Sequence, residues 1–260
     1  MDSLTRRIAV VTLALPLAAL LASSTSHGAG LSVRSRADDL VNAAMALYRE
    51  GEYSQAAEKL QAALRARPGY APAHQLLAVT YHALRDPDKA LDHYWAVQRL
   101  SFPPLPKDAT KAQTRERELL VACEAVLAIQ LNNTRMERNL GLCIPDVRLA
   151  RVARQHSNEM RDKSYFAHGS PTPGYETITD RFRRVFGDLR IYSIAENIAQ
   201  HYATGYYSLS TGNAHETHSQ WMNSPGHRTN ILTPKFNHVG LGIAANRNGD
   251  YWATQFFAQF

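Results

Sequence analysis

Apolar and polar positions follow a helical spacing from Ala37 onward, and the pattern returns after 34 residues. Large and small residues recur at matching places in both copies, at Leu40, Ala44, Gly51, Tyr53, Leu60 and Pro68 and then at His74, Ala78, Arg85, Pro87, Tyr94 and Phe102. A period of this length is typical of an antiparallel helix pair that packs on the next pair. Residues 37–104 are therefore predicted to form two helical hairpins.

The length of 34 residues is that of the tetratricopeptide repeat, so we interpret 37–104 as two tetratricopeptide-like repeats that form an all-α array. Arg85 stands where the first copy has Gly51, which makes the second copy less regular. Two such repeats bury little surface, and about three units are usually needed for stability. A linker and capping helix predicted over 105–118 would cover the second repeat and join it to the rest of the chain.

The pattern changes in the C-terminal half, where short helices are mixed with strands. The spacing predicts helices from Arg148 to Met160, Ile178 to Phe186 and His215 to Met222. The chain closes with two apolar runs, 239–245 and 251–260, on either side of a turn at 246–250, as in a β-hairpin. The last strand is rich in aromatic residues, so we expect it to be central in a sheet. The fold class is α+β.

The N-terminus has the layout of a secretory signal peptide, predicted over residues 1–29. Arg6 and Arg7 precede a largely apolar run over 8–22, and small and polar residues follow it. We expect the protein to be exported, to a periplasmic or extracellular location. The apolar run is short for a bilayer span of about 20 residues, so no transmembrane anchor is expected in the mature chain.

Composition and charge narrow the choice of partners. The chain has 260 residues, of which 45% are apolar and 20% charged, and these values are ordinary for a globular protein. Its net charge of +6 is spread along the whole sequence, so no nucleic-acid partner is expected. The one dense basic group comprises Arg181, Arg183, Arg184 and Arg190, and we interpret it as a solvated helix face.

The two cysteines, Cys123 and Cys143, are predicted to be free and buried. The segment between them has mostly helical spacing, and a helix rises about 1.5 Å per residue. Their Cα atoms would then lie much farther apart than the roughly 7 Å that a disulfide allows.

Three ionisable residues stand in apolar or turn-forming surroundings. His168 follows two aromatic residues, Glu196 lies within an apolar run, and His227 follows a Pro-Gly pair. Two imidazoles and a carboxylate are a common ligand set for Zn²⁺ with an open fourth position, so a divalent metal site is the chemical hypothesis. Residue types alone leave open the alternative that these are separate structural residues.

Other catalytic motifs are weaker. His215 and His218 flank an acidic residue, but the second His comes one position too early for the H-E-x-x-H arrangement of zinc proteases. We interpret both as surface residues. No serine stands in a nucleophile-elbow pattern, and neither cysteine has a nearby base in sequence.

Several motifs, in order along residues 119–260, resemble a bacterial CAP domain, the superfamily of cysteine-rich secretory proteins, antigen 5 and pathogenesis-related 1 proteins. The motifs are Asn132-Asn-Thr-Arg135, Ala153-Arg-Gln-His-Ser157, Tyr165-Phe-Ala-His168, Ala195-Glu-Asn-Ile-Ala199, Trp221-Met-Asn-Ser-Pro-Gly-His-Arg228, Val239-Gly-Leu-Gly242 and Trp252-Ala-Thr-Gln-Phe256. The resemblance implies an α-β-α sandwich with a central cavity over 119–260 and an exported protein.

The resemblance also implies a site. His168, Glu196 and His227 match cavity positions that bind a divalent metal, often zinc, in many relatives. A second cavity Glu of the animal and plant members is replaced here by Ser224, and whether Glu216 or a water substitutes is left open. We interpret Trp221, Arg228, Asn132 and Arg135 as packing and capping residues.

Two main functions follow as hypotheses, beside a third possibility in which the CAP half is purely structural and the repeats carry all function. In the first, an exported protein binds a divalent metal or a small, lipid-like or cell-envelope ligand in its His/Glu cavity, while the repeats bind a protein partner. In the alternative, a metal-dependent hydrolase with Glu196 as base acts on peptide, ester or envelope substrates. The missing nucleophile favours binding over catalysis.

Overall fold

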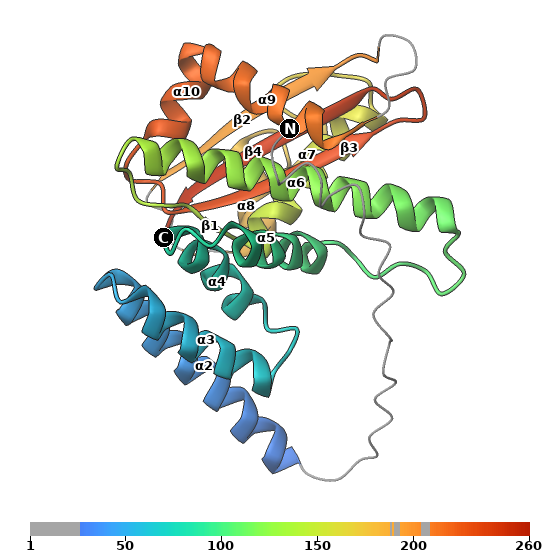
Figure 1. Ribbon diagram of the computed structural model, residues 1–260. Helices are drawn as coiled ribbons and strands as arrows, with labels where there is room; N and C mark the ends of the chain where they lie inside the picture. Colours follow the sequence, from blue (N-terminus) through green and yellow to red (C-terminus); the bar gives the residue numbers. More distant parts are fainter. Residues whose placement is uncertain (1–26, 188, 190–192, 204–208) are drawn as a thin grey trace.

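The structure is a computed structural model that describes residues 27–187, 189, 193–203 and 209–260. Most of the predicted signal peptide and Arg190 lie outside these residues. The chain forms a helical array that packs against a larger α/β half (Figure 1). Within the described ranges, no helix combines the length and apolarity that a membrane crossing needs.

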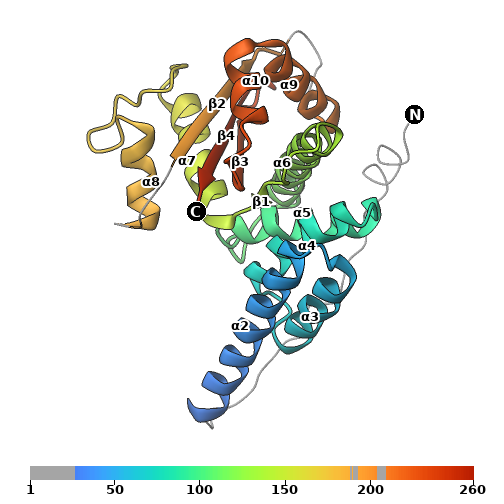
Figure 2. The ribbon, with the colours of Figure 1, turned by 90° about the vertical axis from the view of Figure 1, so that its left-hand side faces the viewer.

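The array contains two antiparallel helix pairs, as predicted from the 34-residue period. They are α2 (His27–Arg49), α3 (Tyr53–Ala66), α4 (Ala71–Ala83) and α5 (Pro87–Ser101). Figure 2 shows the pairs stacked at the lower end of the molecule. Gly51 and Arg85, which are 34 positions apart, both have a left-handed backbone, with φ of 83° and 57°. The turn between the two helices of a repeat therefore has the same backbone form in both copies.

The predicted capping helix is part of a longer one, α6 (Lys111–Glu137). Thr110 begins it with a capping box, in which its side chain accepts from the N–H of Gln113 and the Gln113 side chain accepts from the N–H of Thr110. The helix packs against α5 of the second repeat and against α9 and β3 of the other half. It also runs through residue 118, where we placed a domain boundary, so one helix belongs to both halves.

The C-terminal half is a three-layer sandwich around a four-stranded sheet. Its strands run in the order β1 (Ile144–Pro145), β3 (His238–Ala245), β4 (Tyr251–Gln259) and β2 (Ser193–His201). The predicted hairpin is confirmed, and its aromatic last strand is central. Helices α7 (Val147–Asp162) and α8 (Ile178–Phe186) lie on one side, while α6, α9 (Thr211–Asn223) and α10 (Pro225–Leu232) lie on the other (Figure 2).

Helix α7 lies almost in contact with the backbone of β3. A Cβ atom at Gly240 would collide with the backbone of Leu149, and one at Gly242 with the backbone of Arg154. The two glycines therefore set the distance between helix and strand, because only residues without a side chain allow so close an approach.

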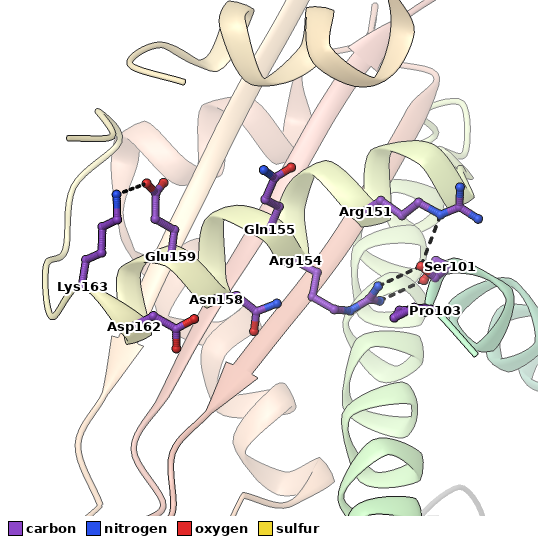
Figure 3. Close-up of a pocket in the computed structure, with 9 residues that line it drawn as sticks. All are labelled: Ser101, Pro103, Arg151, Arg154, Gln155, Asn158, Glu159, Asp162 and Lys163. Carbon is purple, nitrogen blue, oxygen red and sulfur yellow. Dashed lines mark hydrogen bonds and ion pairs between the residues drawn. The ribbon is translucent and has the colours of Figure 1, made fainter. Parts of the chain in front are cut away.

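A buried ion pair joins the two halves at the end of α5. Arg154 on α7 donates from Nε to Glu124 on α6 at 2.9 Å and from Nη2 to the second carboxylate oxygen. The same guanidinium donates to the hydroxyl of Ser101 at 2.9 Å (Figure 3). It also lies 3.5 Å from the ring centre of Phe102. Glu124 also accepts from the N–H of Ile243 on β3 at 2.9 Å. The Glu124 carboxylate thus connects α6, α7 and the sheet, and Arg154 extends the network to the second repeat.

A second network crosses the same boundary. Asn132 on α6 donates to Tyr94 of α5 at 2.6 Å and to the carbonyl of Cys143 at 2.9 Å, and it accepts from the N–H of Cys143. Both Cys123 and Cys143 are free and buried, as predicted. Burial raises the pKa of the Cys143 thiol to about 11, so this thiol is not prepared to act as a nucleophile.

Replacing Glu124 by Ala should destabilise the protein by about 3–5 kcal/mol, because it leaves the Arg154 guanidinium charged and buried. The free energy of unfolding in urea is the measurement. The control is Arg99→Ala, which breaks an exposed ion pair with Glu118 and should cost under about 1 kcal/mol. Equal losses in the two variants would contradict the role given to Glu124.

Candidate functional site

The site is built around Glu196, near the middle of β2. Side chains alternate across a strand, so Glu196 faces α7 and α8 while Asn197 faces α10. The Glu196 side chain is 2% exposed. A carboxylate this deeply buried requires compensating partners.

The main partner of Glu196 is Arg181 on α8. Its Nη2 atom donates to both carboxylate oxygens, at 3.0 and 2.8 Å, and the Arg181 side chain is only 1% exposed. The capping box of Thr177 and Asp180 begins α8 and places Arg181 in its first turn. The expected solvated face holds for Arg183 and Arg184 but is wrong for Arg181.

His168 is the second partner, and its Nδ1 atom lies 3.0 Å from Oε1 of Glu196. A carboxylate can only accept, so the ring carries a proton on Nδ1, and neutral His168 has its acceptor on Nε2. The side chain is 59% exposed, so this acceptor edge is accessible. Glu196 therefore fixes both the orientation and the tautomer of an exposed imidazole.

The charge balance keeps Glu196 ionised. Burial by itself raises the pKa of Glu196, but the hydrogen bond from His168 and the charges of Arg181 and His156 outweigh it, and the net shift is downward. Because its pKa is lowered, Glu196 is a weak base. The accessible acceptor of this site is therefore the Nε2 atom of His168.

The loop that carries His168 is held from α7 at two points. His156 contacts the carbonyl oxygen of Ala167 through Nε2 at 3.1 Å. Glu159 accepts hydrogen bonds from Tyr165 and Ser170, each at 2.9 Å, and from Thr172. Figure 3 shows Glu159 paired with Lys163 at the end of the helix. The loop thus has side-chain anchors before and after His168.

A surface pocket of about 430 Å³ opens beside His168. Its lining comes from the His168 loop, the start of α8 and the first half of β2, namely His168, Gly169, Glu176, Thr177, Ile178, Ile194, Ala195 and Glu196. The exposed imidazole is thus on the rim of a hollow large enough for a small ligand.

His227 lies in the first turn of α10, next to the same edge of the sheet. Its carbonyl oxygen accepts from Nδ2 of Asn197 at 3.2 Å. Burial, and then the charge of nearby His168, lowers the pKa of His227. The two imidazoles are therefore close enough to interact electrostatically, but no described hydrogen bond joins His227 to Glu196.

The donor set does not fit the three-ligand zinc site expected from the sequence. Arg181 contacts both oxygens of Glu196, so this carboxylate would have to break a buried ion pair to coordinate a cation. Among the described residues, no group of three or more His, Cys, Asp or Glu side chains is arranged to hold a metal ion. Glu216 is exposed on α9 and does not replace the missing second Glu.

Comparison of the chain with known proteins identifies its family. The family model described as "Cysteine-rich secretory protein family" (CAP) matches residues 130–259, half of the chain. The chain belongs to the CAP family. A tetratricopeptide repeat model matches residues 47–94. Both matches lie within the ranges expected from the sequence.

Three relatives illustrate how far the similarity reaches. The Uncharacterized protein YkwD of Bacillus subtilis (strain 168) is 33% identical over 61% of this chain and 56% of its own length. The Uncharacterized membrane protein YlbC of the same strain is 30% identical over 43% and 29%. A crystal structure of an extracellular SCP-domain protein from Bacillus anthracis is 29% identical over 61% and 45%, with a TM-score of 0.45. The chain thus spans little more than half of the first relative.

The other motif residues of the CAP half are structural. Trp221 is 1% exposed and donates to the carbonyl of Ile198 at 3.1 Å. Arg135 donates to the carbonyl oxygens of Gly141, Ile231, Thr233 and Phe236. These residues match the packing and capping roles predicted for them.

His218 was expected on the surface of the CAP half, and this is wrong. The residue is 5% exposed, and its Nε2 atom lies 2.8 Å from the hydroxyl of Thr134 on α6. His215, one turn earlier on α9, is exposed as expected.

Replacing Arg181 by Met should destabilise the CAP domain by about 3–5 kcal/mol, because Glu196 would lose its buried counter-ion. Chemical denaturation measures this loss. The matched control is Arg183→Met on the exposed face of the same helix, which should change stability by less than about 0.5 kcal/mol. If the two variants were equally stable, Arg181 would not be the counter-ion of Glu196.

The anchor at Glu159 predicts a dependence of stability on pH. Partial burial raises the pKa of Glu159, but hydrogen bonds from Thr172, Ser170, Tyr165 and Lys163 outweigh it and lower the value from 4.5 to about 2. The unfolded chain therefore binds this proton at higher pH than the folded chain does. The stabilisation is complete above pH 4.5 and is lost as the pH falls toward about 2.

The measurement is the free energy of unfolding from neutral pH down to about pH 3. Glu159→Gln should be less stable than the parent at neutral pH and should lose less stability on acidification. The exposed control Glu137→Gln should follow the parent curve. A Glu159→Gln curve that parallels the parent would show that the carboxylate is not linked to folding.

Proposed function

We propose that this CAP protein is exported and acts as a binding protein. Its CAP half binds a small polar ligand at the pocket beside His168, and its repeats hold a protein partner. The observation that carries the proposal is the free Nε2 edge of His168, oriented by a carboxylate that is itself neutralised by Arg181. An oriented, accessible acceptor at the rim of a pocket suits the recognition of a ligand that donates a hydrogen bond.

The same geometry argues against Glu196 as a hydrolytic base. A base needs a pKa near the working pH, whereas the pKa of Glu196 is lowered by its partners. Both of its carboxylate oxygens also accept hydrogen bonds from Arg181. A hydrolase that uses this pocket would have to depend on His168 instead.

Export and the protein partner rest on other features. The N-terminal sequence has the layout of a signal peptide. The repeat pair is joined to the CAP half where Arg154, held by Glu124, donates to Ser101 at the end of α5, which would keep a bound partner near the CAP half. Cell fractionation with an antibody against the CAP half would test the location.

Calorimetry with Zn²⁺ alone, and separately with soluble fragments of cell-envelope polymer, tests the ligand. The envelope fragments should bind saturably, and His168→Ala should weaken the binding by about tenfold, the loss of one hydrogen bond. His215→Ala, on the exposed face of α9, is the matched control and should bind as the parent does. Zinc should bind more weakly than at a three-ligand site, because Glu196 is engaged.

Chromatography of the same fragments after incubation distinguishes binding from turnover. Unchanged fragments support the binding function. Cleavage that disappears in His168→Ala would replace it with hydrolysis, and binding that is unaffected by His168→Ala would place the ligand elsewhere.

A further inference from the structure

A second pocket lies where the repeats meet α6, apart from the His168 site. Its volume is about 220 Å³, and it is enclosed by the end of α4, the start of α5 and the last turns of α6. The apolar part of the lining comes from Pro87, Ala90, Ile129 and Met136. The hydrogen-bonding or charged groups belong to His82, Arg85 and Asn133. The three polar groups come from α4, the following turn and α6.

The buried side of the His82 ring contacts Tyr94. Its Nδ1 atom lies 3.3 Å from the hydroxyl of Tyr94, which already accepts a hydrogen bond from Asn132 at 2.6 Å. The hydroxyl proton of Tyr94 is therefore free to be donated to Nδ1. Neutral His82 must then carry its own proton on Nε2, at the opposite edge of the ring.

The Asn133 side chain lies close enough to the His82 ring to influence its pKa, but among the described residues no hydrogen bond of ordinary geometry satisfies the Nε2–H group, although His82 is only 6% exposed. Burial, offset in part by the nearby Asn133 side chain and reinforced by the charge of Arg85, lowers the pKa of His82 to about 4. The ring is thus neutral near physiological pH. A buried donor without an acceptor costs about 1–3 kcal/mol, which a ligand that supplies an acceptor would recover.

Arg85 adds a charge at the edge of this pocket. It holds a left-handed backbone with φ of 57°, where the first repeat has Gly51. That conformation costs a side-chain-bearing residue about 1–2 kcal/mol. The guanidinium is exposed and has no described ion pair or hydrogen bond, while the neighbouring Asp86 is paired with Lys89 at 2.7 Å. A strained, exposed position whose charge has no partner among the described residues leaves the guanidinium available to a ligand.

We propose that this pocket binds a carboxylate attached to a short apolar group. Arg85 supplies the charge, His82 and Asn133 supply donors, and the walls from α5 and α6 receive the apolar part. The volume is below the roughly 300–1,000 Å³ of drug-sized sites, so it suits a group the size of one amino-acid residue. A small free acid and the C-terminus of another chain share this chemistry. The inference does not depend on the function proposed for the CAP half.

Calorimetry on the full chain with N-acetyl-valine and with its neutral amide tests the charge requirement. The acid should bind at least about tenfold more tightly than the amide, as expected for a charge-assisted contact. Equal affinities, or no binding of the acid at about 10 mM, would overturn the proposal.

Two variants locate the site. Arg85→Gly should weaken binding of the acid by about tenfold without lowering the thermal midpoint, because glycine relieves the left-handed strain. Asn133→Asp should weaken it similarly by placing a like charge in the pocket. Lys107→Ala removes the same charge from the exposed linker and should change nothing. Unaltered affinity in both pocket variants would place the acid elsewhere and refute the assignment.

Peptides distinguish the two sources of the carboxylate. A hexapeptide that ends in valine with a free carboxyl is compared with N-acetyl-valine and with the same peptide amidated at its C-terminus. Tighter binding of the free peptide would identify a protein C-terminus as the occupant, and equal affinity of peptide and small acid would identify a small acid. Binding of the amidated peptide as tight as that of the free peptide would contradict carboxylate recognition.

Discussion

The architecture depends on the neutralisation of one buried carboxylate. Glu124 has no exposed surface, yet it connects the guanidinium of Arg154 with the N–H of Ile243, while Arg154 also reaches Ser101 at the end of the second repeat. Such a pair contributes little net stability compared with apolar packing, but its loss leaves a charge buried. The constraint therefore acts mainly on geometry. It favours the arrangement in which α6, α7, the sheet and the end of the second repeat meet, because separating these elements would leave buried charges unpaired.

The candidate site also contains a buried arginine–carboxylate pair, but there the pair orients a third side chain. Arg181 neutralises Glu196, and Glu196 then orients His168 from beneath. The exposed imidazole is thus the outermost member of a chain of contacts that begins in the core. In the family resemblance the carboxylate counts as a metal ligand, whereas here its oxygens are occupied by protein donors. The contacts present in the structure use Glu196 to orient His168, and its role as a metal ligand stays a prediction.

The sequence allowed the helices, the hairpin and the central last strand to be predicted, because periodicity and turn residues are local signals. The sequence also identified His168 and Glu196 as candidates, because apolar or aromatic neighbours are unusual for ionisable side chains. Arg181 was missed because it lies in a run with Arg183 and Arg184, and nothing local distinguishes the buried member from the exposed ones. His218 was misplaced for a similar reason, since its burial depends on Thr134, which is 84 residues away. Partners brought together only by the tertiary fold leave no trace in local spacing.

Helix α6 packs along one unbroken length against both the second repeat and the sandwich. Its 27 residues span about 40 Å, and its last turns line the pocket at Arg85 while its middle anchors Arg154. Helix α7, which anchors the His168 loop, is tied to the middle of α6 through Arg154, so both proposed pockets are connected to this one helix. If both proposed ligands bind, one continuous helix relates the positions of two chemically different occupants.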